Sequence, residues 1–156
     1  MERRSFIKSL GAAAACAALF PRIASAAEEK KPAGPNEMKL EAAVSAITGG
    51  KALTPSSKVK LEAPEIAENG AVVPVKVSVE SPMTSKDYVK AIHVLAAKNG
   101  NVRCVNIYLS PENGEAFFGT RIKLGGTQEV VAIAEMSDGS FLSAQQSVKV
   151  TIGGCG

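Results

Sequence analysis

The sequence predicts a mainly β protein, an immunoglobulin-like antiparallel β-sandwich of about seven strands with a short N-terminal helix and a flexible C-terminal arm. Between residues 58 and 152, short runs alternate apolar and polar side chains, which is the period of a strand with one buried face. Clusters of Gly, Pro, Asn and Asp separate these runs at the spacing typical of a sandwich. The length of 156 residues allows one domain.

The first 26 residues have the features of an export signal. Arg3 and Arg4 precede a short apolar run over residues 10–20, and residues 24–26 (Ala-Ser-Ala) offer a small-residue cleavage site. This order is typical of a removed signal, and the paired arginines indicate the twin-arginine type. We therefore expect cleavage after Ala26 and a periplasmic protein. Lipidation at Cys16 is an alternative that the alanines before it disfavour.

The export segment also accounts for the apparent positive charge of the chain. The whole sequence has 18 Lys and Arg against 15 Asp and Glu. Residues 1–26 hold four of the basic and one of the acidic residues, which leaves 14 of each. A neutral chain gives no reason to expect nucleic acid or a membrane surface as a partner.

Residues 27–50 are predicted to form a linker and a short helix. The linker, residues 27–35, is charged and contains proline, as linkers often do. Asn36 is placed to cap the helix and Gly49 to end it. Apolar residues between them recur at helical spacing, namely Leu40, Ala43, Val44 and Ile47. Such a helix needs another surface to pack against.

Residues 51–152 are predicted to form the sandwich. Its first strands cover residues 58–61 and 73–79, and the second has alternating valines. Pro74 lacks an N–H, so this strand begins there or lies at a sheet edge. Asp138-Gly139 is a strong hairpin signal. The remaining strands are predicted at residues 89–97, 102–109, 117–124, 129–136 and 141–152.

The usual catalytic sets are missing from the sequence. His93 is the single histidine and lies within an apolar strand, where a histidine is usually a hydrogen-bonded core or interface residue. No set of His, Cys and carboxylates has metal-ligand spacing, and no Gly-rich loop opens a helix. We therefore expect no metal and no cofactor, and a self-sufficient enzyme is disfavoured.

Cys155 is the residue whose setting points to a function. It stands between Gly153-Gly154 and Gly156, directly after the last predicted strand. Glycine gives the backbone wide freedom and no side chain to pack, so residues 153–156 are predicted to be a mobile arm that bears a thiol. No Lys, Arg or His flanks the cysteine, so no sequence neighbour activates it. An accessible thiol of this kind suits a carrier on which other proteins act.

Cys104 supports a competing interpretation. It is predicted to point away from the core, because Val105, Ile107 and Leu109 share the other, core-like face of the strand. An exported pair of cysteines favours a disulfide. A Cys104–Cys155 bond would fix the tail of a non-catalytic structural or interaction module. A thiol oxidoreductase is a third interpretation, disfavoured because there is no Cys-x-x-Cys pair.

The chain resembles the SoxY family, the sulfur-carrier subunits of the periplasmic thiosulfate-oxidising Sox system. The resemblance covers nearly all of the chain after residue 26. The matching residues are Ile47-Thr48-Gly49-Gly50, 64–70 with Val73-Pro74-Val75, 80–84, 120–122, 134–141 and above all 148–156. One departure is in the tail, because the family usually ends Gly-Gly-Cys-Gly-Gly and this chain has one glycine fewer.

The resemblance implies a non-catalytic carrier with Cys155 as the covalent attachment site and Gly153, Gly154 and Gly156 as its swinging arm. It implies SoxZ as the heterodimer subunit. SoxAX, a c-type haem enzyme, would join thiosulfate to the thiol, SoxB would release sulfate, and SoxCD, where present, would oxidise the remaining sulfur. Self-association through Cys155, or without SoxZ, is compatible with it. Cys104 is outside the carrier motif, and we expect it at a subunit interface, where an intermolecular disulfide could form.

Overall fold

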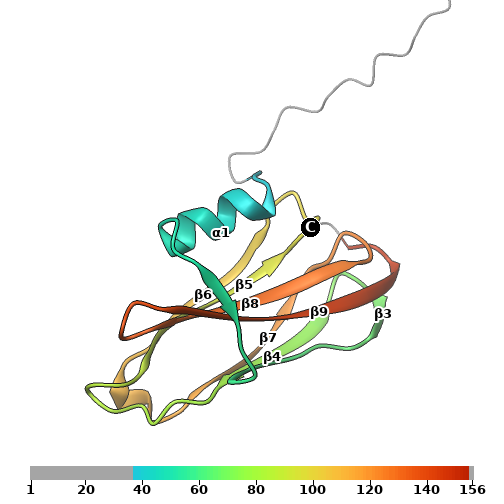
Figure 1. The fold of residues 1–156 in the computed structure, drawn as a ribbon. Helices are drawn as coiled ribbons and strands as arrows, with labels where there is room; N and C mark the ends of the chain where they lie inside the picture. Colours follow the sequence, from blue (N-terminus) through green and yellow to red (C-terminus); the bar gives the residue numbers. More distant parts are fainter. Residues whose placement is uncertain (1–36, 155–156) are drawn as a thin grey trace, which may run out of the picture. The chain divides into compact units, whose positions relative to one another are not determined.

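The computed structural model describes residues 37–154 as one helix, one short 3-10 turn and nine strands (Figure 1). The helix is α1 (Leu40–Thr48) and the turn is η1 (Pro111–Asn113). The strands are β1 (Leu53–Pro55), β2 (Val59–Glu62), β3 (Ile66–Asn69), β4 (Val73–Val79), β5 (Val89–Ala96), β6 (Arg103–Tyr108), β7 (Ala116–Ile122), β8 (Gln128–Met136) and β9 (Phe141–Ile152).

The strands form two sheets that pack face to face. The larger has the order β1-β9-β8-β5-β6, with β3 paired to the end of β9, and the smaller has the order β2-β4-β7. All the long ladders are antiparallel, whereas β1 and β3 pair with β9 in parallel. Two sheets over a shared core make an immunoglobulin-like β-sandwich, which confirms the predicted fold class.

Two apolar clusters hold the sandwich together. The main cluster lies between the sheets and includes the four inward valines of β4, each at most 5% exposed. The second lies on the outer face of the larger sheet under α1 and includes Ala43, Leu95, Val102, Val131, Ile133 and Phe141. β5 and β8 are therefore buried on both faces, which explains why their sequences are almost continuously apolar.

Helix α1 covers the second cluster with the face that its spacing predicts, Leu40, Ala43, Val44 and Ile47. Gly49 ends it in the left-handed conformation at φ 63°, as a C-terminal glycine does. The predicted cap differs, because Lys39 is the N-cap and makes no side-chain capping bond. Asn36 lies outside the described residues. Within the described part of the chain, no helix is long and apolar enough to cross a membrane.

The sequence did not predict β1 and β3. Their sequences, Leu-Thr-Pro and Ile-Ala-Glu-Asn, have no alternating apolar pattern. They form because β9 is 12 residues long and its outer edge offers unpaired backbone groups at both ends. Pro74 is the second residue of β4. Strand β2 pairs only with Lys76 to Val79 of β4, so the N–H that Pro74 lacks is not needed for a bond to β2.

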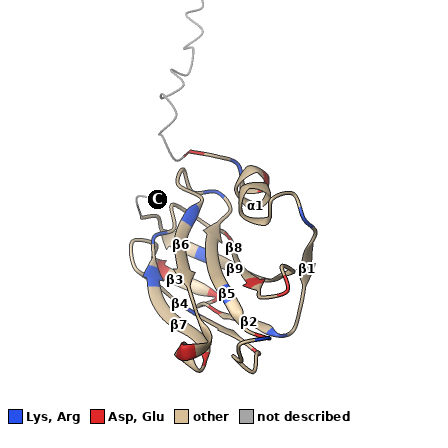
Figure 2. Cartoon of the chain, turned by 90° about the vertical axis from the view of Figure 1, so that its left-hand side faces the viewer, with Lys and Arg blue, Asp and Glu red and all other residues tan. Residues whose placement is uncertain are grey.

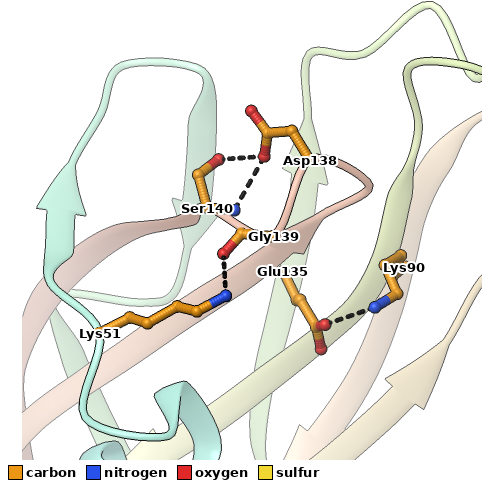
Figure 3. Close-up of polar contacts among 6 residues, drawn as sticks. All are labelled: Lys51, Lys90, Glu135, Asp138, Gly139 and Ser140. Carbon is orange, nitrogen blue, oxygen red and sulfur yellow. Dashed lines mark hydrogen bonds and ion pairs between the residues drawn. The ribbon is translucent and has the colours of Figure 1, made fainter.

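The turn between β8 and β9 is held by side-chain hydrogen bonds (Figure 3). Asp138 accepts bonds from the backbone N–H of Ser140 at 2.8 Å and from its hydroxyl at 2.6 Å. Gly139 takes φ 81°, and its carbonyl accepts a bond from the Lys51 ammonium at 3.2 Å. These bonds favour the ionised carboxylate, so they hold the pKa of Asp138 below its usual value.

We expect the contribution of Asp138 to the free energy of unfolding to depend on pH. Its folded-state pKa is lowered, so the contribution is present above the unfolded value of about 3.9 and is lost as pH falls through the lower folded value. Asp138→Asn keeps an accepting side-chain oxygen but cannot ionise. In urea unfolding, the wild type should exceed this variant in stability at pH 6, and the difference should shrink as the pH falls below about 3.9. A difference that stays constant over this range would contradict the assignment.

Candidate functional site

The tail, residues 153–156, follows β9 and carries the predicted attachment site. Gly153 and Gly154 belong to the described residues, whereas Cys155 and Gly156 lie outside them. The end of β9 is flanked by β3, with Asn69 opposite Ile152. The position at which the tail leaves the sandwich is therefore fixed by a parallel strand pair.

Three backbone hydrogen bonds join the end of β9, two loops and the tail to one another. The Gly70 N–H donates to the Ile152 carbonyl at 2.7 Å, and the Gly70 carbonyl accepts from the Leu124 N–H at 2.7 Å. The Leu124 carbonyl then accepts from the Gly154 N–H at 2.9 Å. Leu124 is fully buried in the main core, so its side chain anchors the backbone groups that bind the tail.

The glycines at this contact are required by close packing. A Cβ atom on Gly154 would lie 2.5 Å from the Ala71 nitrogen and 2.7 Å from the Gly70 carbonyl carbon. One on Gly153 would overlap the Gly125 carbonyl oxygen, and one on Gly70 would overlap that of Leu124. We call this set of approaches, Gly153–Gly154 against Gly70–Ala71 and residues 124–126, the tail contact.

The tail contact differs from the prediction that the chain becomes a free arm directly after Ile152. Gly153 and Gly154 pack against the sandwich, so the structure shows them docked. The prediction failed because a glycine can serve either a flexible segment or a close approach between two backbones. The sequence does not show which of these applies to Gly153 and Gly154. Cys155 is the first residue beyond the docked pair.

A buried polar network supports the loop that receives the tail. The Asn99 amide donates to the Lys123 carbonyl at 2.7 Å, and its oxygen accepts from the Gly125 N–H at 3.0 Å. Gln128 donates to the same Asn99 oxygen at 2.8 Å. Both amides are over 90% buried. Leaving any of these groups unpaired would cost about 1–3 kcal/mol, so the network fixes residues 123–125. Sequence reasoning missed both amides, because their partners are distant in the chain.

Cys104 does not point away from the core, and the prediction that it does is wrong. The ladder between β5 and β6 pairs Val94 with Val105 but Leu95 with Arg103, so Cys104 is an extra residue in a β-bulge. The bulge breaks the alternation, and the half-buried Cys104 packs against the main core.

The chemistry of Cys104 follows from this position. Burial raises the pKa of its thiol to about 11, and the thiol is free, bonded only weakly to the Val102 carbonyl at 3.8 Å. Because the thiolate is the reactive form, the raised pKa lowers the reactivity of the Cys104 thiol. A Cys104–Cys155 bond and a disulfide across a subunit interface both stay predictions, because Cys155 lies outside the described residues.

A basic pocket opens between the edge strands of the two sheets. It has a volume of about 350 Å³ and is lined by Asn99, Asn101, Arg103, Cys104, Arg121, Ile122 and Lys123. In Figure 2, blue bands mark basic residues on β6 and on β7, whose edges face the viewer. The Nε atom of Arg103 is buried without a hydrogen-bond partner. Sequence reasoning missed this pocket, because Arg103 and Arg121 are 18 residues apart in the chain and come together only in the folded sandwich.

His93 is a buried core residue, as predicted. It is 6% exposed, its Nδ1 lies 2.8 Å from the Asn106 side-chain oxygen, and the Tyr108 ring lies edge-on at 6.3 Å. No three His, Cys, Asp or Glu side chains within residues 37–154 are placed to hold a metal ion.

We predict that Gly154→Ala disrupts the tail contact with little effect on the fold. The added methyl group cannot fit beside Ala71, so the tail should detach and the amide of residue 154 should exchange with solvent at least tenfold faster. Gly126→Ala is the matched control, because its Cβ would have no neighbour within 4 Å. Equal exchange rates at residue 154 in the two variants would show that the tail is not held by this packing.

Comparison with known proteins connects the tail to a family. Residues 44–155 match the model of the family described as "Sulfur oxidation protein SoxY". The structure of the sulfur carrier protein SoxY from Chlorobium limicola f thiosulfatophilum superposes with a TM-score of 0.62 at 29% identity, over 73% of this chain and 97% of that chain. Among curated proteins, no match was found.

More distant structures share the fold alone. A superoxide reductase (neelaredoxin) from Ignicoccus hospitalis superposes with a TM-score of 0.55 at 22% identity, over 60% of this chain and 80% of that chain. A putative superoxide reductase from Thermotoga maritima has a TM-score of 0.52 at 18% identity, over 67% and 89% of the two chains. The sandwich therefore occurs in proteins of other functions, and function must be argued from the tail.

Proposed function

The chain belongs to the SoxY family of sulfur oxidation proteins, and from this membership we propose that it is a covalent sulfur carrier of the Sox system with Cys155 as the attachment site. The observation that carries the proposal is the extent of the family match, which runs through Cys155 itself. A solved structure that superposes at 29% identity over 73% of this chain and 97% of that chain is likewise of a sulfur carrier protein.

The proposed chemistry is carried out by partner enzymes. The Cys155 thiolate and thiosulfate would form a sulfur–sulfur bond and lose two electrons to SoxAX, a c-type haem enzyme, giving Cys155–S–S–SO₃⁻. SoxB then adds water, which releases sulfate and two protons and leaves Cys155–S–S⁻. SoxCD, where present, oxidises the remaining sulfur. The carrier supplies a thiol and access to it, and SoxZ is its proposed heterodimer subunit.

We infer further that the tail alternates between a docked and a swinging state. Within the described residues, the tail beyond β9 is held by one hydrogen bond, from the Gly154 N–H to Leu124. A bond of this kind contributes about 0.5–1.5 kcal/mol, so a partner enzyme can detach the tail at low cost. Gly153, Gly154 and Gly156 would then give Cys155 its reach, and the absence of side chains would let it enter a narrow active site.

We propose that the protein acts in the periplasm, because its first 26 residues have the features of an export signal. The paired arginines and cleavage site of residues 1–26 support export by the twin-arginine route, and that segment lies outside the described residues. The Sox system of the family acts in the same compartment, so the location and the proposed role agree.

Cys155→Ala tests the carrier role. We expect this variant to fold normally and to support no thiosulfate oxidation when it replaces the wild type in a reconstituted Sox system. Ser147→Ala, which alters an exposed side chain of β9, is the matched control and should retain full activity. Thiosulfate oxidation by the Cys155→Ala variant would overturn the proposal.

The same variants separate the carrier from the structural module. If a Cys104–Cys155 disulfide fixed the tail, Cys104→Ala and Cys155→Ala would each lower the free energy of unfolding by about 2–4 kcal/mol. We expect Cys155→Ala to leave it unchanged, as measured by urea unfolding without reductant.

A further inference from the structure

Strand β7 is an open edge of the smaller sheet, and its sequence is self-complementary about its central residue, Gly119. We propose that β7 pairs antiparallel with β7 of a second copy of this chain, about a twofold axis at Gly119, so that the smaller sheets of the two copies become one continuous sheet. The proposal goes beyond the carrier function, because it involves neither Cys155 nor the tail.

The edge of β7 offers a regular row of backbone groups. The strand order β2-β4-β7 leaves one side of β7 without a neighbouring strand among the described residues. In an antiparallel sheet, every second residue of an edge strand turns its N–H and C=O away from its partner strand. β7 pairs with β4 along its whole length without a shift in register, and it contains no proline. It therefore lacks the bulge and the proline that commonly prevent a sheet edge from pairing.

The edge of the larger sheet, β6, is less suited to such pairing. Cys104 is an extra residue in that strand, and a bulge interrupts the row of outward backbone groups. The two edges lie on the same side of the sandwich (Figure 2), and of the two it is β7 that is regular throughout. A second copy that approaches this side should therefore pair with β7.

The core-facing side chains of β7 match across the proposed axis. Opposed residues of an antiparallel pair lie on the same face of the sheet, and pairing about Gly119 opposes residues that are equally far from it along the strand. Ala116 would then lie opposite Ile122 of the partner subunit, and Phe118 opposite Thr120 of the partner subunit. These alternate residues are the buried or half-buried ones of the strand, so the core faces of the two copies meet in register.

The outward-facing side chains match as well. Phe117 would lie opposite Arg121 of the partner subunit, and Glu115 opposite Lys123 of the partner subunit. All four side chains are exposed, and Phe117 is 49% exposed although it is aromatic. A guanidinium beside an aromatic ring gains a cation–π interaction, and opposite charges that face each other across strands are stabilising. The twofold axis makes each of these pairs occur twice.

The charges on this edge are not used within one copy. Glu115, Arg121 and Lys123 take no part in the ion pairs found within residues 37–154, which are Lys60–Glu80 and Lys90–Glu135. In Figure 2, a blue band lies on β7 and red marks the loop that leads into its other end. Parallel pairing of two β7 strands in register would oppose each charge to itself, which is destabilising. The charges therefore favour the antiparallel arrangement.

Exchange of the charges of Glu115 and Lys123 tests the arrangement. The probe is the exported chain, residues 27–156, in reductant so that no disulfide contributes, and sedimentation velocity gives its dimer dissociation constant. Glu115→Lys and Lys123→Glu should each raise this constant by about tenfold or more, because each opposes like charges twice. The double variant should restore dimerisation close to that of the wild type. Lys58→Glu, which alters an exposed lysine beside the opposite edge strand β2, is the control and should leave the constant unchanged.

A cysteine at the axis tests the register. Opposed Cα atoms of an antiparallel pair lie about 4.5–5.5 Å apart, which is within the range of a disulfide. In the Cys155→Ala chain, Gly119→Cys should therefore give a disulfide-linked dimer in oxidised glutathione. Its Cβ would meet only the Lys76 side chain at 3.6 Å and the Val75 carbonyl oxygen at 4.0 Å, which are ordinary contacts. Ser78→Cys, on β4, is the matched control and should give none, since β4 lies one strand further from the axis.

Three results would each overturn the inference. They are a wild-type chain that stays monomeric up to about 1 mM, where even a weak complex forms, a double charge variant as weak as the single ones, and equal cross-linking at Gly119 and Ser78. None of these measurements uses the Cys155 thiol. Their failure would leave the carrier role intact, and that role is decided separately by Cys155→Ala in the oxidation assay.

Discussion

Backbone-to-backbone contact between the tail and two loops is the constraint on which the site depends. Gly70, Gly153 and Gly154 approach neighbouring backbone atoms so closely that a Cβ on any of them would collide. Leu124 connects this contact to the core, because its side chain is fully buried while its N–H and carbonyl bind Gly70 and Gly154. Gly153 and Gly154 are therefore docked on the sandwich, and beyond β9 one backbone hydrogen bond holds them there.

The rest of the sandwich serves to position this contact. β9 runs the length of the larger sheet and gives one edge to β1 at its start and to β3 at its end, and β3 leads directly to Gly70. The buried side chains of Asn99 and Gln128 hold the loop of residues 123–125 in place through hydrogen bonds. The same loop forms a wall of the basic pocket. Gly153–Gly154, their docking surface and the pocket therefore share the loop of residues 123–125.

The sequence predicted those features that depend on residues close together in the chain. The alternating valines of β4, the helical face of α1, the Asp138-Gly139 turn and the terminal Gly-Gly-Cys were all readable, because each depends on residues near in the chain. β1 and β3 were missed because an edge of β9 creates them. Cys104 was misplaced because a bulge shifts the strand by one residue, and alternation cannot show a bulge. The basic pocket was missed because Arg103 and Arg121 become neighbours only when the two sheets pack.

The central claim is that Cys155 carries sulfur, and intact-protein mass spectrometry tests it most directly. The chain should be purified from its periplasm without reductant, and its tail peptide should then be mapped. The account predicts adducts on Cys155 with the mass of added sulfur or of a thiosulfonate, which reductant removes. A chain lighter than the reduced form by two hydrogen atoms, with Cys104 joined to Cys155, would contradict it, because the tail would then be fixed and the thiol unavailable.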